Sequence, residues 1–338
     1  MRFAIIGAQH FHIVGISREA VLEPDIELVA VVERQDDVRE QLSKEFGVPG
    51  YTDYRDLLAS GKVDAVAIAP INSEKGALIV ECLDAGVHAL VDKPGLTTLE
   101  DLDKVEAALA RGRARLYCAL TLRFSPHYAM ARSIVARGDI GTVVGSYAQR
   151  PHKLGIVKRP DWMFKRTTYG GALLDLGIHD IDMMRWLHNA EPTTVMATEG
   201  NVRFTTTPEF TDHYTAAFRF PNNVAGLVRG SWLTPDATPW HGDTRLFVEG
   251  AKGYLEIRDK PTPTILLNTN GNPREITEFH ATDEVEPRAH QNAMLRDFVA
   301  VTQGRSDTVL TPHDVIESHR WTLLARQAAE TGGLVRRG

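Results

Sequence analysis

The feature of this sequence that most constrains its fold is an alternation of short apolar runs with helical stretches through the first third of the chain. The clearest helical stretch, 99–112, repeats apolar residues every three or four positions. Continuous apolar strands that alternate with helices predict a parallel sheet covered on both faces. The five apolar runs are 3–6, 27–32, 63–69, 87–91 and 116–120.

After about residue 122 the pattern changes. Helices are predicted at 126–137 and 173–187, and turn signals separate a series of segments with period-two alternation or β-branched residues. Two helices, at 289–303 and 313–331, close the chain. The pattern predicts an N-terminal α/β domain with a parallel sheet over 1–121. It also predicts an α+β domain over 122–338 with a mostly antiparallel sheet. The predicted strands are 142–149, 194–199, 213–220, 224–233, 245–248, 254–257 and 264–267.

Composition excludes several classes of function. The formal charge is −6, without a basic run, so nucleic-acid binding is not expected. No uninterrupted apolar stretch is long enough to span a membrane, and residues 1–7 lack the features of a signal peptide. Cys82 and Cys118 are the two cysteines, which fits buried core positions in a reducing compartment. We therefore expect a cytoplasmic protein.

A turn suited to phosphate binding follows the first apolar run. Gly7 can make the tight turn, and the helix behind it offers unpaired N–H groups and partial positive charge to a diphosphate. Glu33, at the end of the second run, suits a ribose diol and therefore NAD, while Arg34 leaves NADP open. Ordinary turn and surface roles remain the alternative at each position. The turn consists of Gly7, Ala8, Gln9, His10, Phe11 and His12, with Gln9 where the usual second glycine stands.

Asp92-Lys93-Pro94 directly follows the fourth apolar run. Ligands of open α/β sheets bind at the carboxyl ends of the strands, so Lys93 is expected to point toward the cofactor cleft. A lysine there can hydrogen-bond a substrate hydroxyl and stabilise negative charge that develops on its oxygen. The alternative is a surface lysine beside a turn.

The most informative stretch is 170–182, GGALLDLGIHDID. Asp175 and His179 are four residues apart and share one face of a helix, and Gly177 allows another group to come close. A histidine titrates near neutral pH and can accept the proton of an alcohol as hydride leaves, so we interpret His179 as the base. His10, His12, Asp175 and His179 could also ligate a metal, but His10 and His12 lie on the phosphate turn, and no metal is predicted.

Together these landmarks resemble the glucose–fructose oxidoreductase / inositol dehydrogenase / rhizopine catabolism family. The likeness rests on the Gly7 turn, Asp92-Lys93-Pro94 in place of Glu-Lys-Pro, the segment from Arg123 to Pro126, and 170–182. It implies a dinucleotide-binding domain of the Rossmann type over 1–121. It also implies an α+β domain over 122–338 with a large, mostly antiparallel open sheet, whose final helix packs back near the first domain. Lys93, Asp175 and His179 are the catalytic residues that the resemblance implies. The family's Thr-Pro-Asn and following histidine correspond here to Pro70-Ile71-Asn72 and Lys75. The resemblance adds Ala69, Pro70, Asn72, Lys75, Asp92 and Lys93 to the expected cofactor contacts.

The resemblance implies an NAD(P)-dependent dehydrogenase of sugars or polyols that forms dimers or tetramers through its C-terminal sheet. NAD is the expected cofactor, with NADP possible. Two alternatives stay open: a hydrolase or lyase that oxidises its substrate transiently with bound NAD, and a catalytically silent sugar or dinucleotide sensor. The expected substrate contacts are Lys93, Arg123, His152, Trp162, Lys165, Tyr169, Asp175 and His179.

Overall fold

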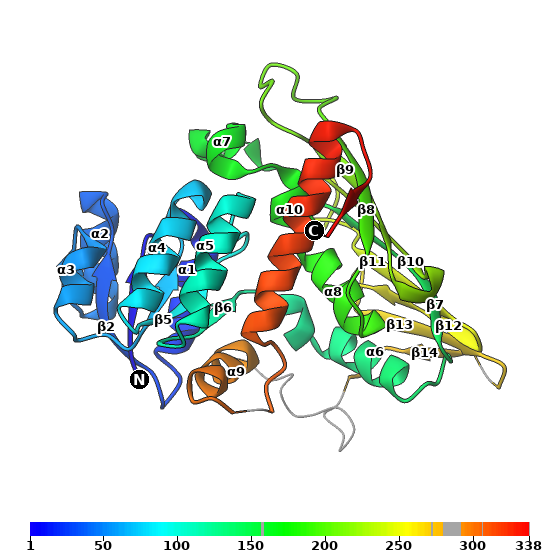
Figure 1. Cartoon of the computed structure of the whole chain (residues 1–338), viewed down its shortest axis with the longest axis horizontal. Helices are drawn as coiled ribbons and strands as arrows, with labels where there is room; N and C mark the ends of the chain where they lie inside the picture. The colour runs from blue at the N-terminus through cyan, green and yellow to red at the C-terminus, as the bar shows by residue number, and fades with distance from the viewer. Residues whose placement is uncertain (157–158, 272, 280–291, 306, 338) are drawn as a thin grey trace. The chain divides into compact units, whose positions relative to one another are not determined.

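The computed structural model of the chain describes residues 1–156, 159–271, 273–279, 292–305 and 307–337 (Figure 1). The chain forms two compact units. The first consists of Met1–Ala119, Thr167–Tyr169 and Gln291–His319. The second consists of Leu120–Arg166, Gly170–His290 and Arg320–Gly338.

The first unit contains a six-stranded parallel sheet with the order β3-β2-β1-β4-β5-β6. This order confirms the predicted Rossmann fold, because the strand order reverses beside β1 and so creates a ligand crevice at the carboxyl ends of the strands. The two-residue strand β3 is too short to produce a pattern in the sequence. The strands are β1 Arg2–Ile6, β2 Glu27–Val32, β3 Gly50–Tyr51, β4 Ala65–Ile68, β5 His88–Val91 and β6 Leu116–Cys118.

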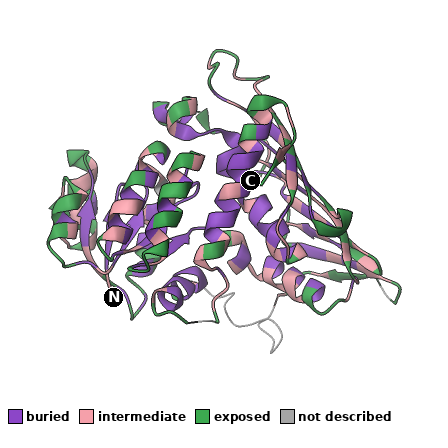
Figure 2. Ribbon diagram, in the orientation of Figure 1, coloured by how far each residue is buried: buried purple, intermediate pink, exposed green. Residues whose placement is uncertain are grey.

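Helices cover this sheet, and Figure 2 shows its strands buried between them. Phe298, on α9, packs against Phe3 and Tyr117, with ring centroids 6.3 and 5.6 Å apart. Neither Cys82 nor Cys118 forms a disulfide with a described residue, and both are fully buried, as predicted. Residues 289–291 of the predicted helix 289–303 lie outside the described residues. The helices are α1 Phe11–Ala20, α2 Asp36–Phe46, α3 Tyr54–Ala59, α4 Lys75–Asp84, α5 Leu99–Ala110 and α9 Ala293–Thr302.

The second unit contains a nine-stranded sheet with the order β14-β13-β12-β11-β7-β10-β9-β8-β15. Its neighbouring strands pair antiparallel except β7 and β10, which are parallel. The prediction of a large, mostly antiparallel open sheet is therefore confirmed. The strands are β7 Val143–Pro151, β8 Thr194–Gly200, β9 His213–Arg219, β10 Ala225–Ser231, β11 Arg245–Gly250, β12 Gly253–Arg258, β13 Thr264–Thr269, β14 Arg274–Ile276 and β15 Val335–Arg336.

Helices α6 (Pro126–Ala136) and α8 (Ile178–His188) pack on one face of this sheet (Figure 1). A π-helical turn, Leu173–Gly177, leads directly into α8. The short helix α7 (Arg166–Tyr169) and the long helix α10 (Pro312–Thr331) each contribute residues to both units. None of the described helices combines the length and the apolar character that crossing a bilayer requires.

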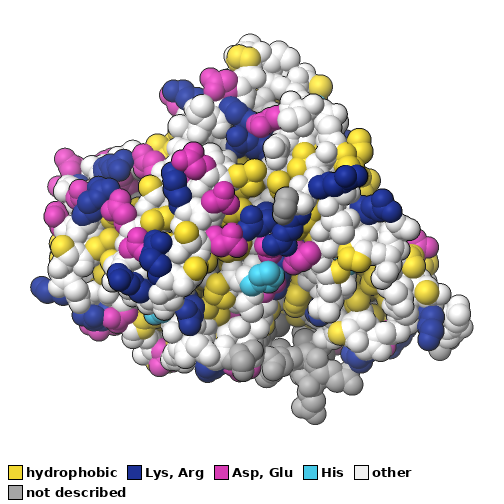
Figure 3. Space-filling model, in the orientation of Figure 1, with side chains coloured by type: hydrophobic (Ala, Val, Ile, Leu, Met, Phe, Trp, Pro, Cys, Tyr) yellow, Lys and Arg dark blue, Asp and Glu magenta, His cyan; other side chains and the backbone are white. Residues whose placement is uncertain are grey.

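The opposite face of the same sheet carries a row of apolar side chains. Pairing in register aligns one residue from each of five neighbouring strands, and these residues are partly or fully exposed while their neighbours along each strand are mostly buried. On the face of the molecule shown in Figure 3, by contrast, acidic and basic side chains are interspersed. The row consists of Met196, Ala217, Leu227, Tyr147 and Phe247.

Candidate active site

The turn after β1 lies tightly against the segment that follows β4. Gly7 has a φ of +76°, and a Cβ at this position would lie 2.6 Å from the Pro70 nitrogen. The amide of Gln9 donates to the carbonyl of Ala69 at 3.0 Å. The first glycine is therefore required by both its backbone conformation and its surroundings, and Gly7, Gln9, Ala69 and Pro70 lie together.

Glu33 holds this turn from the neighbouring strand. Its carboxylate accepts hydrogen bonds from the backbone amides of Ala8, Arg34 and Gln35 at 2.7, 2.8 and 3.1 Å. The side-chain amide of Gln9 lies 3.3 Å from the same carboxylate. Gln9 stands where the fingerprint has its second glycine. Its side chain therefore contacts Glu33, the acidic residue expected to bind the ribose.

A cavity of about 420 Å³ opens beside this turn. Its lining includes Gly7, Gln9, Glu33 and Arg34, all predicted cofactor residues, and Arg34 pairs with Glu74 at 3.2 Å. Three features fit the adenosine and diphosphate portion of a dinucleotide. They are a glycine turn with no room for a Cβ, the N-terminus of a helix, and the carboxylate at the end of β2. Sequence reasoning missed other lining residues, including Tyr54, Arg55, Ile71 and Glu74.

Buried groups hold the backbone of the loop that carries Lys93. The Lys75 ammonium donates to the carbonyls of Asp92 and Pro94 at 2.9 and 3.0 Å, and the amide of Gly95 donates to His319 Nε2 at 2.9 Å. Lys75 is fully buried. The Lys75 charge is therefore used within the loop, and we leave Lys75 out of the proposed cofactor contacts. Lys93 itself is 8% exposed.

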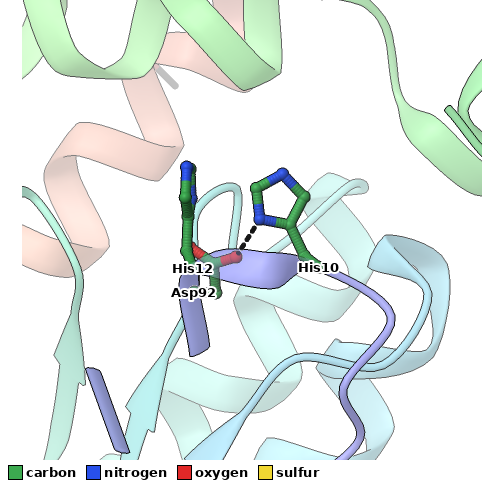
Figure 4. A group of neighbouring side chains, drawn as sticks. All are labelled: His10, His12 and Asp92. Carbon is green, nitrogen blue, oxygen red and sulfur yellow. Dashed lines mark hydrogen bonds and ion pairs between the residues drawn. The ribbon is translucent and has the colours of Figure 1, made fainter. Parts of the chain in front are cut away.

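The side chain of Asp92 lies below two imidazoles (Figure 4). Its carboxylate oxygens are 2.9 Å from His10 Nδ1 and 3.4 Å from His12 Nδ1. Burial alone would raise the pKa of Asp92, but the two imidazoles and the Lys75 charge hold it well below its ordinary value. Burial also lowers the pKa of His10, which Asp92 only partly offsets. Phe11 begins α1, and its side chain lies outside what the structure describes.

Asn72, a predicted cofactor residue, is buried and donates its side-chain amide to the carbonyl of Tyr169 at 3.0 Å. Tyr169 is itself buried and belongs to the first unit. The short segment 167–169 is thereby fixed beside the residues that follow β4. This contact gives Asn72 a structural role and links it to a residue predicted to contact substrate.

In the second unit, Asp175 lies in the π-helical turn and His179 lies in the first turn of α8. Asp175 is buried and His179 is partly exposed. Gly177 permits the close approach expected of it, since a Cβ there would lie 3.3 Å from the ring of Tyr214. A π-helical turn often marks a functional site, and the sequence pattern had indicated an ordinary helix here.

The remaining acidic residues of 170–182 form buried ion pairs that fix α8. Asp180 pairs with Arg150 at 2.7 Å, and Asp182 pairs with Arg123 at 2.7 Å. The side chains of Arg123 and Asp182 are each 1% exposed. Arg123, expected to contact substrate, is thus engaged within the unit, and we leave it out of the proposed substrate contacts.

The other predicted substrate residues of the second unit differ in accessibility. His152 is partly exposed and packs edge-on against His241 and Trp232, with ring centroids 4.5 and 5.9 Å apart. Lys165 is exposed. Trp162 is only 8% exposed, which leaves little of its ring for stacking on a sugar. Sequence reasoning missed His241 and Trp232, because distant loops bring them to His152.

Comparison with known proteins gives a consistent result. Residues 1–120 match the oxidoreductase family with an NAD-binding Rossmann fold, and residues 128–256 match the GFO/IDH/MocA C-terminal domain. The uncharacterized oxidoreductase YrbE of Bacillus subtilis is 26% identical over 83% of this chain and 80% of its own length. Myo-inositol 2-dehydrogenase of Thermotoga maritima is 25% identical over 79% and 78%, respectively. The structure of aldose-aldose oxidoreductase from Caulobacter crescentus, complexed with glycerol, shares the fold, with a TM-score of 0.84 at 21% identity over 100% of this chain and 99% of that one.

Proposed function

The chain belongs to the glucose–fructose oxidoreductase / inositol dehydrogenase / rhizopine catabolism family of NAD-binding oxidoreductases, and we propose that it oxidises a secondary alcohol of a sugar, a polyol or a close derivative. The observation that carries the proposal is the anchored loop of Lys93. A largely buried ammonium on a backbone fixed by Lys75 and His319 is held in place before a substrate arrives. Such preorganised charge is what stabilises a developing alkoxide.

The residues have distinct proposed roles. Lys93 donates a hydrogen bond to the reacting oxygen, and His179 accepts the hydroxyl proton at an imidazole nitrogen. Asp175 binds or orients the groups around that proton transfer. When bound, the nicotinamide supplies the hydride acceptor for the carbon that is oxidised. His152 and Lys165 are proposed to contact the other hydroxyls of the substrate, whereas Tyr169, which is 1% exposed, is left out.

The Gly7 turn and the cavity beside it are proposed to hold the adenosine and diphosphate portion of the cofactor. The cofactor is of the NAD type, as the family requires. We propose that NAD is preferred over NADP, because the Glu33 carboxylate would repel a 2′-phosphate. Arg34 is exposed and already paired with Glu74, so its charge is partly compensated.

The apolar row on the second sheet supports a homodimer or homotetramer. Met196, Tyr147 and Phe247 lie in register on the face opposite α6 and α8, and Met196 is 53% exposed. A contiguous exposed apolar row of this kind is typical of a protein–protein interface. Sedimentation analysis of the wild type and Phe247→Asp tests this, and a wild type that stays monomeric at micromolar concentration contradicts it.

The proposed activity is tested with a panel of sugars, polyols, uronic acids and amino sugars, each assayed with NAD and NADP by absorbance at 340 nm. We expect at least one panel member to reduce the cofactor. Lys93→Ala should lower kcat by about 10²-fold or more, the size of effect found for transition-state donors, while NAD binding stays measurable. Lys104→Ala, on the exposed side of α5, serves as the control. Full activity of Lys93→Ala would contradict the role of Lys93.

A further inference from the structure

Three side chains with metal-binding chemistry meet at the carboxyl ends of β1 and β5. His10 and His12 belong to the turn and helix after β1, and Asp92 directly follows β5. One ligand atom from each residue lies within 4.8 Å of the other two. Figure 4 shows both imidazoles on the same side of the Asp92 carboxylate. His10 can join His12 because it stands before the first turn of α1 with an extended backbone, φ −123° and ψ 129°.

One oxygen of the buried carboxylate at the base of this cluster lacks a well-aligned hydrogen-bond donor. Asp92 is 1% exposed, and its Oδ2 accepts no hydrogen bond of standard geometry from the described residues, although His10 Nδ1 lies 2.9 Å away. The close approach therefore does not direct the imidazole N–H at the oxygen. A buried carboxylate oxygen without a well-aligned donor is less stable than a fully hydrogen-bonded one, and a cation bound by both the His10 nitrogen and this oxygen would relieve that cost.

Nearby positive charge decides which cation fits. The Lys75 ammonium is fixed on the carbonyl of Asp92, and the Lys93 charge acts on His10. These charges oppose any ion held by electrostatic attraction alone, which disfavours Mg²⁺ and Ca²⁺. Late first-row ions form coordinate bonds with imidazole nitrogen, so the two histidines select ions such as Zn²⁺, Co²⁺ and Ni²⁺.

We propose that His10, His12 and Asp92 form a three-ligand site for a late first-row divalent cation of the zinc class. Three protein ligands leave one coordination position for water or a ligand oxygen, as in zinc sites that are not closed. The His12 side chain is 37% exposed and gives the ion a path from solvent. The proposal goes beyond the dehydrogenase activity and does not require it.

The test uses the full-length chain, freed of metal by a chelator and studied without dinucleotide. Co²⁺ is titrated while visible absorbance is recorded, and Zn²⁺ is titrated by calorimetry. We expect saturation at one ion per chain, with the strong visible bands of four-coordinate Co²⁺. His12→Asn and Asp92→Asn should each weaken binding by more than about 10-fold, the loss that even outer-shell changes cause at zinc sites. His313→Asn, which alters an exposed histidine of α10, should bind as the wild type does.

Folding of each variant is checked by far-UV circular dichroism and by its metal-free unfolding temperature. If Asp92→Asn does not fold, His12→Asn still decides the question, because its side chain is partly exposed. Zn²⁺ should raise the unfolding temperature of the wild type and of His313→Asn, and should leave that of His12→Asn unchanged. A wild type without saturable binding, or wild-type affinity in His12→Asn, would overturn the proposal. Because no dinucleotide or substrate is present, failure of the proposed dehydrogenase activity would not alter this result.

Discussion

Replacing Lys75 with methionine isolates the anchor of the Lys93 loop. Methionine keeps most of the volume of lysine but removes the donor that serves the carbonyls of Asp92 and Pro94. Both residues are buried, so water cannot easily replace the ammonium. An unsatisfied buried acceptor costs about 1–3 kcal/mol, so two cost about 2–6 kcal/mol.

A compensating term reduces this sum. Burying an ammonium carries a desolvation cost of several kcal/mol, and Lys75→Met removes that cost. We therefore expect the free energy of unfolding to fall by an amount at or below the bottom of that range, about 1–2 kcal/mol. We also expect a lower kcat, because the backbone that positions Lys93 is loosened.

The stability change is measured by urea unfolding. Far-UV circular dichroism follows both units, whereas tryptophan fluorescence reports the second unit, which contains every tryptophan. Lys104→Met is the matched control, because Lys104 is exposed and pairs with Glu100 on the surface of α5. The control should change the free energy of unfolding by less than about 0.5 kcal/mol. If Lys75→Met also changes it by less than that, the argument that Lys75 anchors the loop is wrong. The five tryptophans are Trp162, Trp186, Trp232, Trp240 and Trp321.

Three further predictions concern the proposed active site. His179→Asn should remove the acidic limb of the kcat/KM profile of the wild type, because a protonated imidazole cannot accept the hydroxyl proton; a pH–rate profile that keeps this limb would contradict His179 as the base. Gly7→Ala should weaken NAD binding by about 10-fold or more, equivalent to about 1.4 kcal/mol, because its Cβ would press on Pro70, whereas Gly86→Ala has a similar φ but open space around it and should bind NAD normally; equal affinities would show that the contact with Pro70 does not shape the turn. Glu33→Gln should raise the ratio of kcat/KM for NADP to that for NAD by about 10-fold, since the charge that repels a 2′-phosphate is removed while the side-chain shape is kept; an unchanged ratio would mean that Glu33 does not determine cofactor preference.

The sequence was sufficient to predict the architecture because regular patterns encode it. Continuous apolar runs predicted the parallel strands, and period-two alternation predicted the antiparallel strands. Most predicted strand ends lie within a few residues of the observed ones. The elements that were missed are the ones with too few residues to carry a period, such as β3 and β15. The π-helical turn before α8 was also missed, because its extra residue per turn changes the hydrogen bonding without changing the apolar pattern.

The partners of the site residues were harder to predict, because they come from other parts of the chain. Lys75 and Arg123 are typical ligand-binding residue types, but their partners are a distant backbone and the buried Asp182. Assigning a charged residue to a ligand from the sequence assumes that its side chain has no partner within the protein. Whether it has such a partner depends on burial and on contacts with distant residues, which the sequence pattern does not reveal.

Two departures from the family pattern involve the turn after β1 in the same way. Gln9 replaces a glycine, and its side-chain amide reaches Glu33, whose carboxylate also holds the amide of Ala8. Asp92 replaces a longer glutamate, and His10 and His12 stand over its carboxylate. In both cases a side chain of the turn after β1 meets an acidic residue at the end of another strand. The turn is therefore held by side-chain contacts with carboxylates as well as by its glycine. Substituting Gln9 with glycine in this chain would restore the usual fingerprint but remove one of those contacts, so the fingerprint alone does not predict how firmly the turn is held.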